Sequence, residues 1–206
     1  MTTAPDDTRR LIGAETSQAV SAHGVELVTD GYEEAPHRHA RAQLILGISG
    51  MITCTVADGL WMVPPGCAVW IPGGTEHSVR AAGKLELYIL KVDEAIAPDL
   101  PTQACTITVS PLLRELVIEV ARTSPAYDEA GPAGRLIGTM LDRLATAPIE
   151  RLHLPLPSDP RLRRIADAIT ADPSDRSTIG EWARRVGLSE RTLFRLVPEQ
   201  TGMTFG

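Results

Sequence analysis

Three histidines and one glutamine lie at spacings that could form a metal site. His37, His39 and Gln43 are separated by even numbers of residues, so on one regular strand their side chains would share a face and point into a barrel. His77, on a neighbouring strand, would complete the set. Three imidazoles and one side-chain oxygen suit a borderline divalent ion, so we expect Zn, Ni, Fe or Mn as the cofactor at these four residues.

Two other interpretations of these residues stay open. Gln43 lacks the charge of a carboxylate, which lowers the affinity of the site for a cation. The three histidines would then hydrogen-bond an organic effector directly in a metal-free pocket, or form a satisfied polar core without function. Trp61 and Trp70 lie in the same region and would either line an effector pocket or pack in the barrel core.

The elements that carry these residues are predicted to be strands. Between residues 25 and 92, short apolar and β-branched runs alternate with turn residues, which predicts an antiparallel sandwich or barrel. We expect chain breaks at Ser49-Gly50 and at Ala82-Gly83, among others. The predicted strands are Gln43–Ile48, Met51–Val56, Leu60–Val63, Ala68–Ile71 and Leu85–Val92.

Glycine, proline and histidine spacings in this region form two motifs. The first consists of Gly31, His37, His39, Gln43 and Gly50, and the second of Gly66, Pro72, Gly74 and His77. Together they resemble the two motifs of the cupin family, except that Gln43 replaces the usual Glu and Ala81 replaces the terminal Asn. The resemblance covers residues 31–81 and implies a cupin-like antiparallel barrel, which we expect to be a sensor domain over residues 10–100.

Helical periodicity begins after the barrel. Apolar residues recur at helical spacing in Pro111–Arg122, behind Ser110 as a plausible N-cap, and again in Pro132–Thr146. We expect residues 101–150 to be a helical connector that either caps the barrel or pairs with a second subunit. Four prolines between residues 148 and 160 then indicate an extended linker over residues 151–159.

The remaining segment, residues 160–206, has the features of a helix-turn-helix. Ala183 is small where two helices must approach, Gly187 can adopt the positive φ of a tight turn, and Ser189 can cap the following helix. The residues expected to face the major groove and contact DNA are Ser189, Arg191, Thr192, Phe194 and Arg195.

The residues that follow carry a second resemblance. Leu193, Arg195 and Leu196, with Thr201-Gly202-Met203 and Phe205 after them, resemble the first helix-turn-helix of the AraC/XylS family. The family usually has Phe at position 197 and a basic residue at 198, whereas this chain has Val197 and Pro198. Proline removes a backbone donor, so we expect the reading helix to end early. Phe194, where a polar or small residue is commoner, would contact a thymine methyl.

The family pattern also contains a second helix-turn-helix about 50 residues further on, so we expect a truncated chain that binds promoter DNA poorly.

Charge, cysteine content and hydropathy argue against several other classes of protein. The formal charge is −6, yet residues 159–206 hold eight arginines against seven acids, so the modest basic character lies at the C-terminal side. Three cysteines without a CxxC pair or a signal peptide suggest buried structural thiols and a cytoplasmic protein rather than disulfides. No apolar run approaches the roughly 20 residues of a membrane helix.

The sequence therefore predicts an α+β protein and two principal functions. The first is a ligand- or metal-responsive transcription regulator, a homodimer without enzymatic activity, that senses through the barrel and binds promoter DNA through its C-terminal helices. The second is a metal-dependent cupin enzyme, such as a dioxygenase or isomerase, with a helical tail. Gln43 disfavours the enzyme because an amide cannot act as a general base. An oligomerising binding module without a DNA role is a third, weaker alternative.

Overall fold

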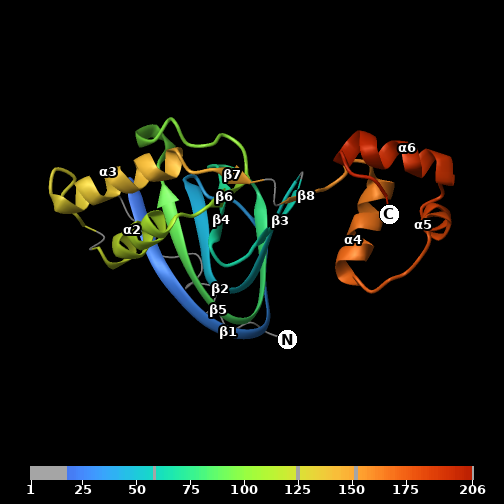
Figure 1. The fold of residues 1–206 in the computed structure, drawn as a ribbon, viewed down its shortest axis with the longest axis horizontal. Coiled ribbons are helices and arrows are strands. Elements are labelled where there is room, and N and C mark those ends of the chain that lie inside the picture. The colour runs from blue at the N-terminus through green and yellow to red at the C-terminus, as the bar shows by residue number, and fades with distance from the viewer. Residues whose placement is uncertain (1–17, 58, 124–125, 151–152, 206) are drawn as a thin grey trace. The chain divides into compact units, whose positions relative to one another are not determined.

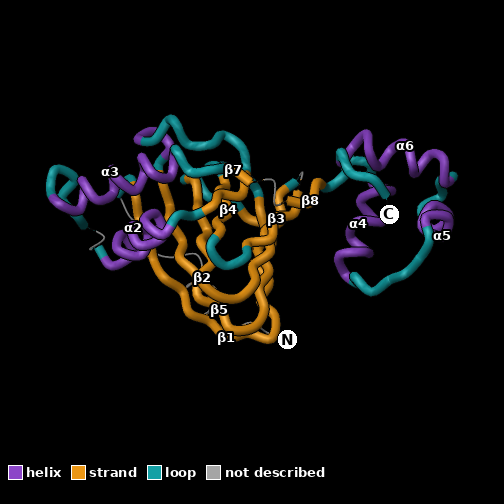
Figure 2. The backbone as a smooth tube through the Cα atoms, in the orientation of Figure 1, coloured by secondary structure: helices purple, strands orange, loops and turns teal. Residues whose placement is uncertain are grey.

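A computed structural model describes residues 18–57, 59–123, 126–150 and 153–205 of the chain. Within them, an antiparallel sheet of eight strands curls into a barrel in the order β1-β5-β2-β4-β6-β7, and β3 pairs with β2 and β8 (Figures 1 and 2). The strands are β1 (Val20–His37), β2 (Ala42–Val56), β3 (Gly59–Val63), β4 (Cys67–Ile71), β5 (His77–Val92), β6 (Cys105–Thr108), β7 (Ile149–Glu150) and β8 (His153–Pro155). The predicted α+β class with an N-terminal antiparallel barrel is confirmed.

Two of the predicted chain breaks are wrong. β2 runs through Ser49-Gly50 and β5 runs through Ala82-Gly83. Gly50 and Gly83 have φ values of +85° and +86°, and the strand pairing shifts register beside both of them. A left-handed glycine in a strand produces a bulge that bends the strand without ending it. These glycines therefore help two long strands to curl.

Alternation along the strands sorts side chains into two clusters. One set, which includes Ile45, Ile52, Val79 and Leu87, packs together inside the curled sheet. The neighbouring residues point the other way and form a second cluster with the two helices that follow β6. Successive strand residues face opposite sides of the sheet. A buried polar residue that points to the same side as Ile45 and Leu87 must therefore lie inside the barrel.

The two connector helices cover the outer face of the sheet (Figure 1). α2 (Pro111–Arg122) and α3 (Pro132–Ala145) match the predicted ranges closely, and the Ser110 side chain accepts a hydrogen bond from the Leu113 N–H at 3.2 Å. Leu113 and Met140 are fully buried against the barrel. The helices therefore cap the barrel, while pairing with a second subunit stays a prediction. A short 3-10 helix, η1 (Glu94–Ile96), follows β5.

The described chain divides into two compact units. The barrel unit consists of Met1–Val56 and Trp61–His153, and the helical unit consists of Ala57–Leu60 and Leu154–Gly206. Of the predicted linker, residues 151 and 152 lie outside the described residues, and β8 occupies 153–155; residues 10–17 of the predicted sensor domain also lie outside them. The helical unit contains α4 (Pro160–Ala171), α5 (Ile179–Arg185) and α6 (Glu190–Thr201).

The expectation that Pro198 ends the reading helix is wrong. α6 continues through it to Thr201 and ends at Gly202, which has φ +67°. Proline removes only its own N–H donor, whereas its carbonyl still accepts a hydrogen bond from the Gly202 N–H at 3.0 Å. The Val197 carbonyl likewise accepts one from the Thr201 hydroxyl at 2.7 Å. The left-handed glycine, not the proline, terminates the helix.

Candidate functional site

The three histidines of the predicted metal site lie together in the barrel unit. His37 is the last residue of β1 and pairs directly with His77, the first residue of β5. The ring centroids of His37 and His77 are 4.4 Å apart, and His39 lies 4.9 Å from His37 and 5.5 Å from His77. One nitrogen from each ring lies within 4.8 Å of the other two. The cluster thus offers three nitrogens that could hold one metal ion.

The reasoning that placed His37, His39 and Gln43 on one regular strand is wrong. β1 ends at His37, His39 lies in the loop that follows, and Gln43 belongs to β2. The loop is held by a backbone hydrogen bond of 2.7 Å from the Gly74 N–H to the His39 carbonyl.

Gly73 makes this close approach feasible, since a Cβ at that position would overlap the carbonyl oxygen of Ala40. The Pro72-Gly73-Gly74 turn therefore positions His39.

Backbone carbonyls fix the orientation of two of the rings. Nδ1 of His37 lies 2.8 Å from the Ala35 carbonyl oxygen, and Nδ1 of His77 lies 3.0 Å from that of Thr75. Because a carbonyl only accepts, each Nδ1 carries the proton and donates it, which leaves a lone pair on Nε2 of the neutral ring. Nε2 of His77 is buried and has no hydrogen-bond partner among the described residues. An orphaned, buried nitrogen of this kind suits a metal ligand.

Burial keeps two of these rings neutral. Desolvation, followed by the nearby Lys91 ammonium, lowers the pKa of His39 from 6.5 to about 4. Desolvation also lowers the pKa of His77, while the Thr75 carbonyl opposes the shift. A neutral imidazole is the form that binds a metal ion. At neutral pH both rings are therefore ready to coordinate a cation without first losing a proton.

Gln43 lies inside the barrel but not on the strand that carries His37. Its side chain is 5% exposed, and its Oε1 has no hydrogen-bond partner among the described residues. Together with Glu34 and several apolar side chains it lines a cavity of about 10 Å³, which is room for about one water. An organic effector would not fit in this cavity.

The two tryptophans predicted for the effector pocket lie in different clusters. Trp61 packs inside the barrel and stacks on His153, with ring centroids 5.3 Å apart. Trp70 packs in the cluster formed with α2 and α3, and its Nε1 donates to the Pro101 carbonyl oxygen at 2.7 Å. Only Trp61 therefore shares the cluster of the barrel interior.

Sequence reasoning missed two charged residues inside the barrel. Lys91 is 4% exposed and pairs with Gln43 across β5 and β2. Glu34, on β1, has its Oε1 3.5 Å from Nε2 of His37. The alternation of the strands could have indicated Lys91, since it continues the inward register of Leu87 and Ile89. Glu34 lies within the first motif, at a position that the motif leaves unspecified.

In the helical unit, the turn between α5 and α6 has the predicted geometry. Gly187 has φ +71°, Ala183 is buried, and the Ser189 side chain accepts a hydrogen bond from the Thr192 N–H at 3.1 Å. Ala183 and the buried Leu193 hold α5 and α6 together with α4. The small core of this unit therefore fixes the angle at which the reading helix is presented.

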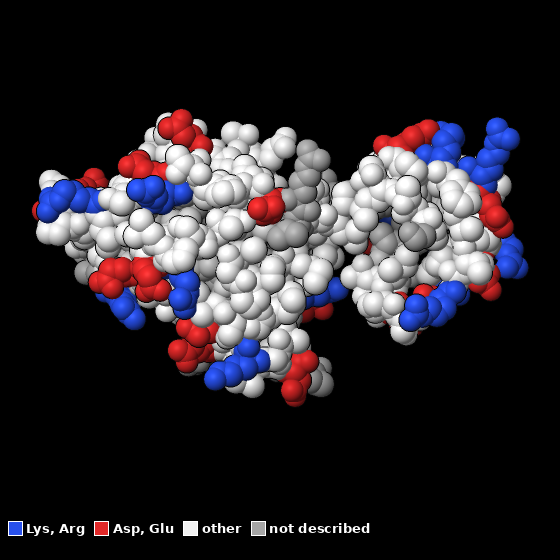
Figure 3. All heavy atoms as spheres, in the orientation of Figure 1, with Lys and Arg blue, Asp and Glu red and all other residues white. Residues whose placement is uncertain are grey.

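Four of the five predicted DNA-contacting residues are exposed and Thr192 is half-buried, and the exposed ones are not equivalent. Phe194 is 54% exposed. Arg195 donates to both carboxylate oxygens of Glu199, at 3.0 and 2.8 Å, whereas Arg191 takes part in no ion pair with the part of the chain that the structure describes. Figure 3 shows basic and acidic side chains interspersed on the helical unit. Arg191 is thus the cation of this face that is available to a phosphate or base.

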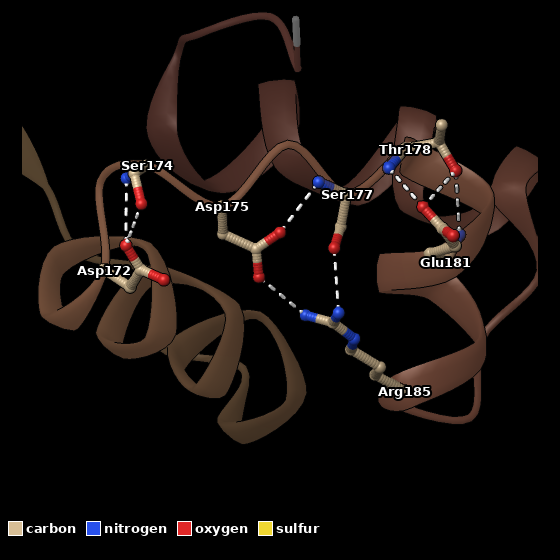
Figure 4. Close-up of polar contacts among 7 residues, drawn as sticks. All are labelled: Asp172, Ser174, Asp175, Ser177, Thr178, Glu181 and Arg185. Atoms are coloured by element: carbon tan, nitrogen blue, oxygen red, sulfur yellow. Dashed lines mark hydrogen bonds and ion pairs between the residues drawn. The ribbon is translucent and has the colours of Figure 1, made fainter.

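A polar network orders the loop before α5 (Figure 4). The guanidinium of Arg185 donates to Asp175 at 2.9 Å and to Ser177 at 2.8 Å, and lies over the Trp182 ring at 4.5 Å. Hydrogen bonds from Ser177 and Arg185 lower the pKa of Asp175 to about 2.

Beside this network, Thr178 and Glu181 form a capping box at the start of α5. Arg185 therefore has a structural role, and its guanidinium is engaged within the unit.

Among the described residues, no helix is long and apolar enough to cross a membrane.

Comparisons with known proteins find one matching family model and a relative that aligns with most of the chain. A family model described as a cupin domain matches residues 24–93, which include both histidine motifs. The chain is 39% identical over 188 residues to the HTH-type transcriptional regulator NimR of Escherichia coli (strain K12), covering 91% of this chain and 68% of that protein.

Two solved structures are similar at low sequence identity. ToxT from Vibrio cholerae is 8% identical, with a TM-score of 0.42 over 91% of this chain and 78% of that one. The AraC-like transcriptional activator CuxR is 14% identical, with a TM-score of 0.46 over 86% of this chain and 70% of that one.

Proposed function

Because the chain belongs to the family of HTH-type transcriptional regulators and carries a cupin domain, we propose that its barrel unit senses a divalent metal ion and that its helical unit contacts promoter DNA. Membership of this family confirms the regulator expected from the AraC/XylS resemblance. The metal ion, the DNA contacts and a homodimeric state belong to the proposal.

The observation that carries the metal proposal is the convergence of three imidazole rings. His37 and His77 each donate Nδ1–H to a backbone carbonyl, which leaves Nε2 as the nitrogen available to an ion, and a nitrogen of His39 lies within 4.8 Å of both rings. Such a nitrogen-rich set suits Zn, Ni, Fe or Mn. When bound, the ion would supply a positive charge that ties the end of β1 to the start of β5 and to the loop that contains His39.

A sensing role fits the barrel of a transcriptional regulator better than a catalytic one. Gln43 places an amide, which cannot act as a general base, at the position where the first cupin motif usually has a carboxylate. For a metal ion to regulate, it must bind one arrangement of the regulator more tightly than another, because equal affinity shifts nothing.

The helical unit would read DNA through the exposed face of α6. Arg191 would contact a base edge or phosphate, Phe194 would contact a thymine methyl, and Arg195 would first have to leave Glu199. Ser189 and Thr192 lie at the start of the helix and would contact the phosphate backbone of the DNA, as helix N-termini do.

Metal content tests the first half of the proposal. Elemental analysis of the full chain, purified without chelators, should find about one equivalent of a divalent transition metal. The double variant His37→Ala/His39→Ala should lose it, whereas His153→Ala, outside the cluster, should retain it. A metal-free protein that also fails to take up Zn²⁺ or Ni²⁺ on dialysis would overturn metal sensing.

DNA binding tests the second half. Fluorescence anisotropy of the full chain on fragments selected from a random DNA pool should show sequence preference that changes when the metal is removed. Arg191→Ala should weaken binding by about 1–3 kcal/mol. Arg143→Ala, an exposed arginine on α3, is the matched control and should have no effect. Equal losses in the two variants would show that the proposed reading face is wrong.

A further inference from the structure

A carboxylate from β1 lies beside His37, one of the three histidines of the cluster. Glu34 pairs with Val79 of β5 in the register that points into the barrel, and its side chain is only 11% exposed. Its Oε1 lies 3.5 Å from Nε2 of His37. Glu34 and Gln43 also line the same small cavity, and Oε1 of Gln43 has no hydrogen-bond partner among the described residues. The barrel therefore holds an acid beside the site even though its first motif has Gln43 in place of Glu.

The distance between Glu34 and His37 fits two ligands of one ion. Nδ1 of His37 donates to the Ala35 carbonyl, so Nε2 is the ring nitrogen that faces the Glu34 carboxylate, and a cation between these two atoms can bind both of them. In a tetrahedral site with bonds of about 2.0–2.1 Å, two ligand atoms are about 3.4 Å apart, close to the 3.5 Å observed.

We propose that Glu34, rather than Gln43, is the oxygen ligand that completes the three-histidine metal site. This inference rests on the proposed metal-sensing function. Glu34 supplies the negative charge that Gln43 lacks, and charge raises the affinity for a divalent ion. Gln43 then lines the adjacent cavity as a neutral neighbour.

The surroundings of Glu34 are suited to holding a ligand in place. Tyr32 and Lys91 both lie within interaction distance of its carboxyl group, and both are almost fully buried. Neighbours that orient a metal-binding carboxylate raise metal affinity. Lys91 also balances the charge of the acid when no ion is bound, so that the metal-free barrel does not contain an uncompensated carboxylate.

Titration of the full chain with Co²⁺ tests the proposal, because bound Co²⁺ is detected by its visible absorption and not by any regulatory activity. The wild type should bind one Co²⁺. Glu34→Gln, which keeps the shape and removes the charge, should raise Kd by at least ~10-fold and shift the absorption bands. The matched control Gln43→Leu should change Kd by less than about threefold and leave the bands unchanged.

Three other outcomes would overturn the Glu34 assignment, the last of them together with the metal-sensing function. If Glu34→Gln binds Co²⁺ like the wild type while His77→Ala does not, the Glu34 assignment fails and metal sensing survives. If Gln43→Leu loses affinity and Glu34→Gln does not, the oxygen ligand is Gln43. If the wild type binds no Co²⁺, both the metal-sensing function and the Glu34 assignment fail.

A second variant keeps the test decisive if Glu34→Gln does not fold. Thermal unfolding without metal shows whether each variant is folded. Glu34→Asp keeps the charge but shortens the side chain by one methylene, so its Co²⁺ affinity should fall between those of the wild type and Glu34→Gln. An Asp variant that is folded and has wild-type affinity and spectrum would contradict direct ligation.

Discussion

The barrel unit and the helical unit place their polar side chains in opposite ways. Inside the barrel, His77, Lys91 and Gln43 are each at most 5% exposed. In the helical unit, each ion pair has at least one exposed side chain, and the small core is apolar apart from the Trp182 ring nitrogen. A large core can compensate the cost of desolvating a few polar groups, whereas a core of a few residues cannot.

This difference in the burial of polar side chains suits the two units to different kinds of ligand. In the histidine site, His77 is buried while His37 and His39 are partly exposed, and such a preorganised cluster suits a ligand as small as an ion. An exposed helix face with a free cation such as Arg191 contacts a macromolecule that remains in solvent. The two units should therefore respond differently to the same perturbation.

Truncation of one leucine in each core should give the largest contrast. Leu193→Ala should cost about 2–5 kcal/mol, and a unit of roughly 50 residues has about 3–8 kcal/mol of stability in total. We therefore expect Leu193→Ala to unfold much of the helical unit, whereas Leu90→Ala, equally buried in the barrel unit, should leave its larger unit folded at room temperature.

Circular dichroism and Co²⁺ binding distinguish these results. Leu193→Ala should lose helical signal and sequence-preferring DNA binding, but it should still bind Co²⁺. Loss of Co²⁺ binding in Leu193→Ala would show that the two units do not fold independently, and would remove the basis of the contrast.

Acid should act on the two units in different pH windows. The folded-state pKa of His39 is about 4, and that of His77 is also below the ordinary 6.5. Between pH 6.5 and 4 the unfolded barrel therefore binds more protons than the folded one, so its free energy of unfolding should fall as the pH falls through this window. In the helical unit the pKa values of Asp159 and Asp175 are lowered from 3.8 to about 2, so their stabilisation should be lost only between pH 4 and 2.

Urea unfolding of the metal-free chain at several pH values measures both effects, with the amide NMR signals of the barrel unit and of the helical unit followed separately. His39→Gln should reduce the pH dependence of the barrel between pH 6.5 and 4. If instead the helical unit loses its stability first on acidification from pH 7 to 5, the assignment of the two windows is wrong.

Local signals in the sequence predicted the helices, whereas the geometry of the barrel needed the tertiary structure. The start of α2 at Pro111 and the turn at Gly187 follow from capping and φ preferences that act over a few residues. The bulges at Gly50 and Gly83 do not, because a left-handed glycine can either end a strand or bend it. The partner strand decides between these outcomes.

The candidate site was predicted only in part, because its geometry also depends on how the strands pair. The motif spacing identified His37, His39 and His77, although the single regular strand used to explain their convergence does not exist. Glu34 lies at an unconstrained motif position, and only the pairing of β1 with β5 brings it toward the site. Lys91 lies in an apolar run, where a single long side chain would ordinarily be assigned to solvent.

The smallest expected contrast concerns two helix caps. Thr178 caps α5 in the helical unit, and Ser110 caps α2 in the barrel unit by the same kind of hydrogen bond. Replacement of either by Ala should cost about 1 kcal/mol of folding free energy.

The consequence of the two substitutions should differ, because about 1 kcal/mol is a larger share of the stability of the smaller unit. Thr178→Ala should lower the unfolding midpoint of the helical unit and weaken DNA binding near physiological temperature, whereas Ser110→Ala should leave Co²⁺ affinity unchanged. Equal midpoint shifts in the two units would mean that their stabilities are similar, and that the contrast between a large and a small core does not govern how each unit tolerates change.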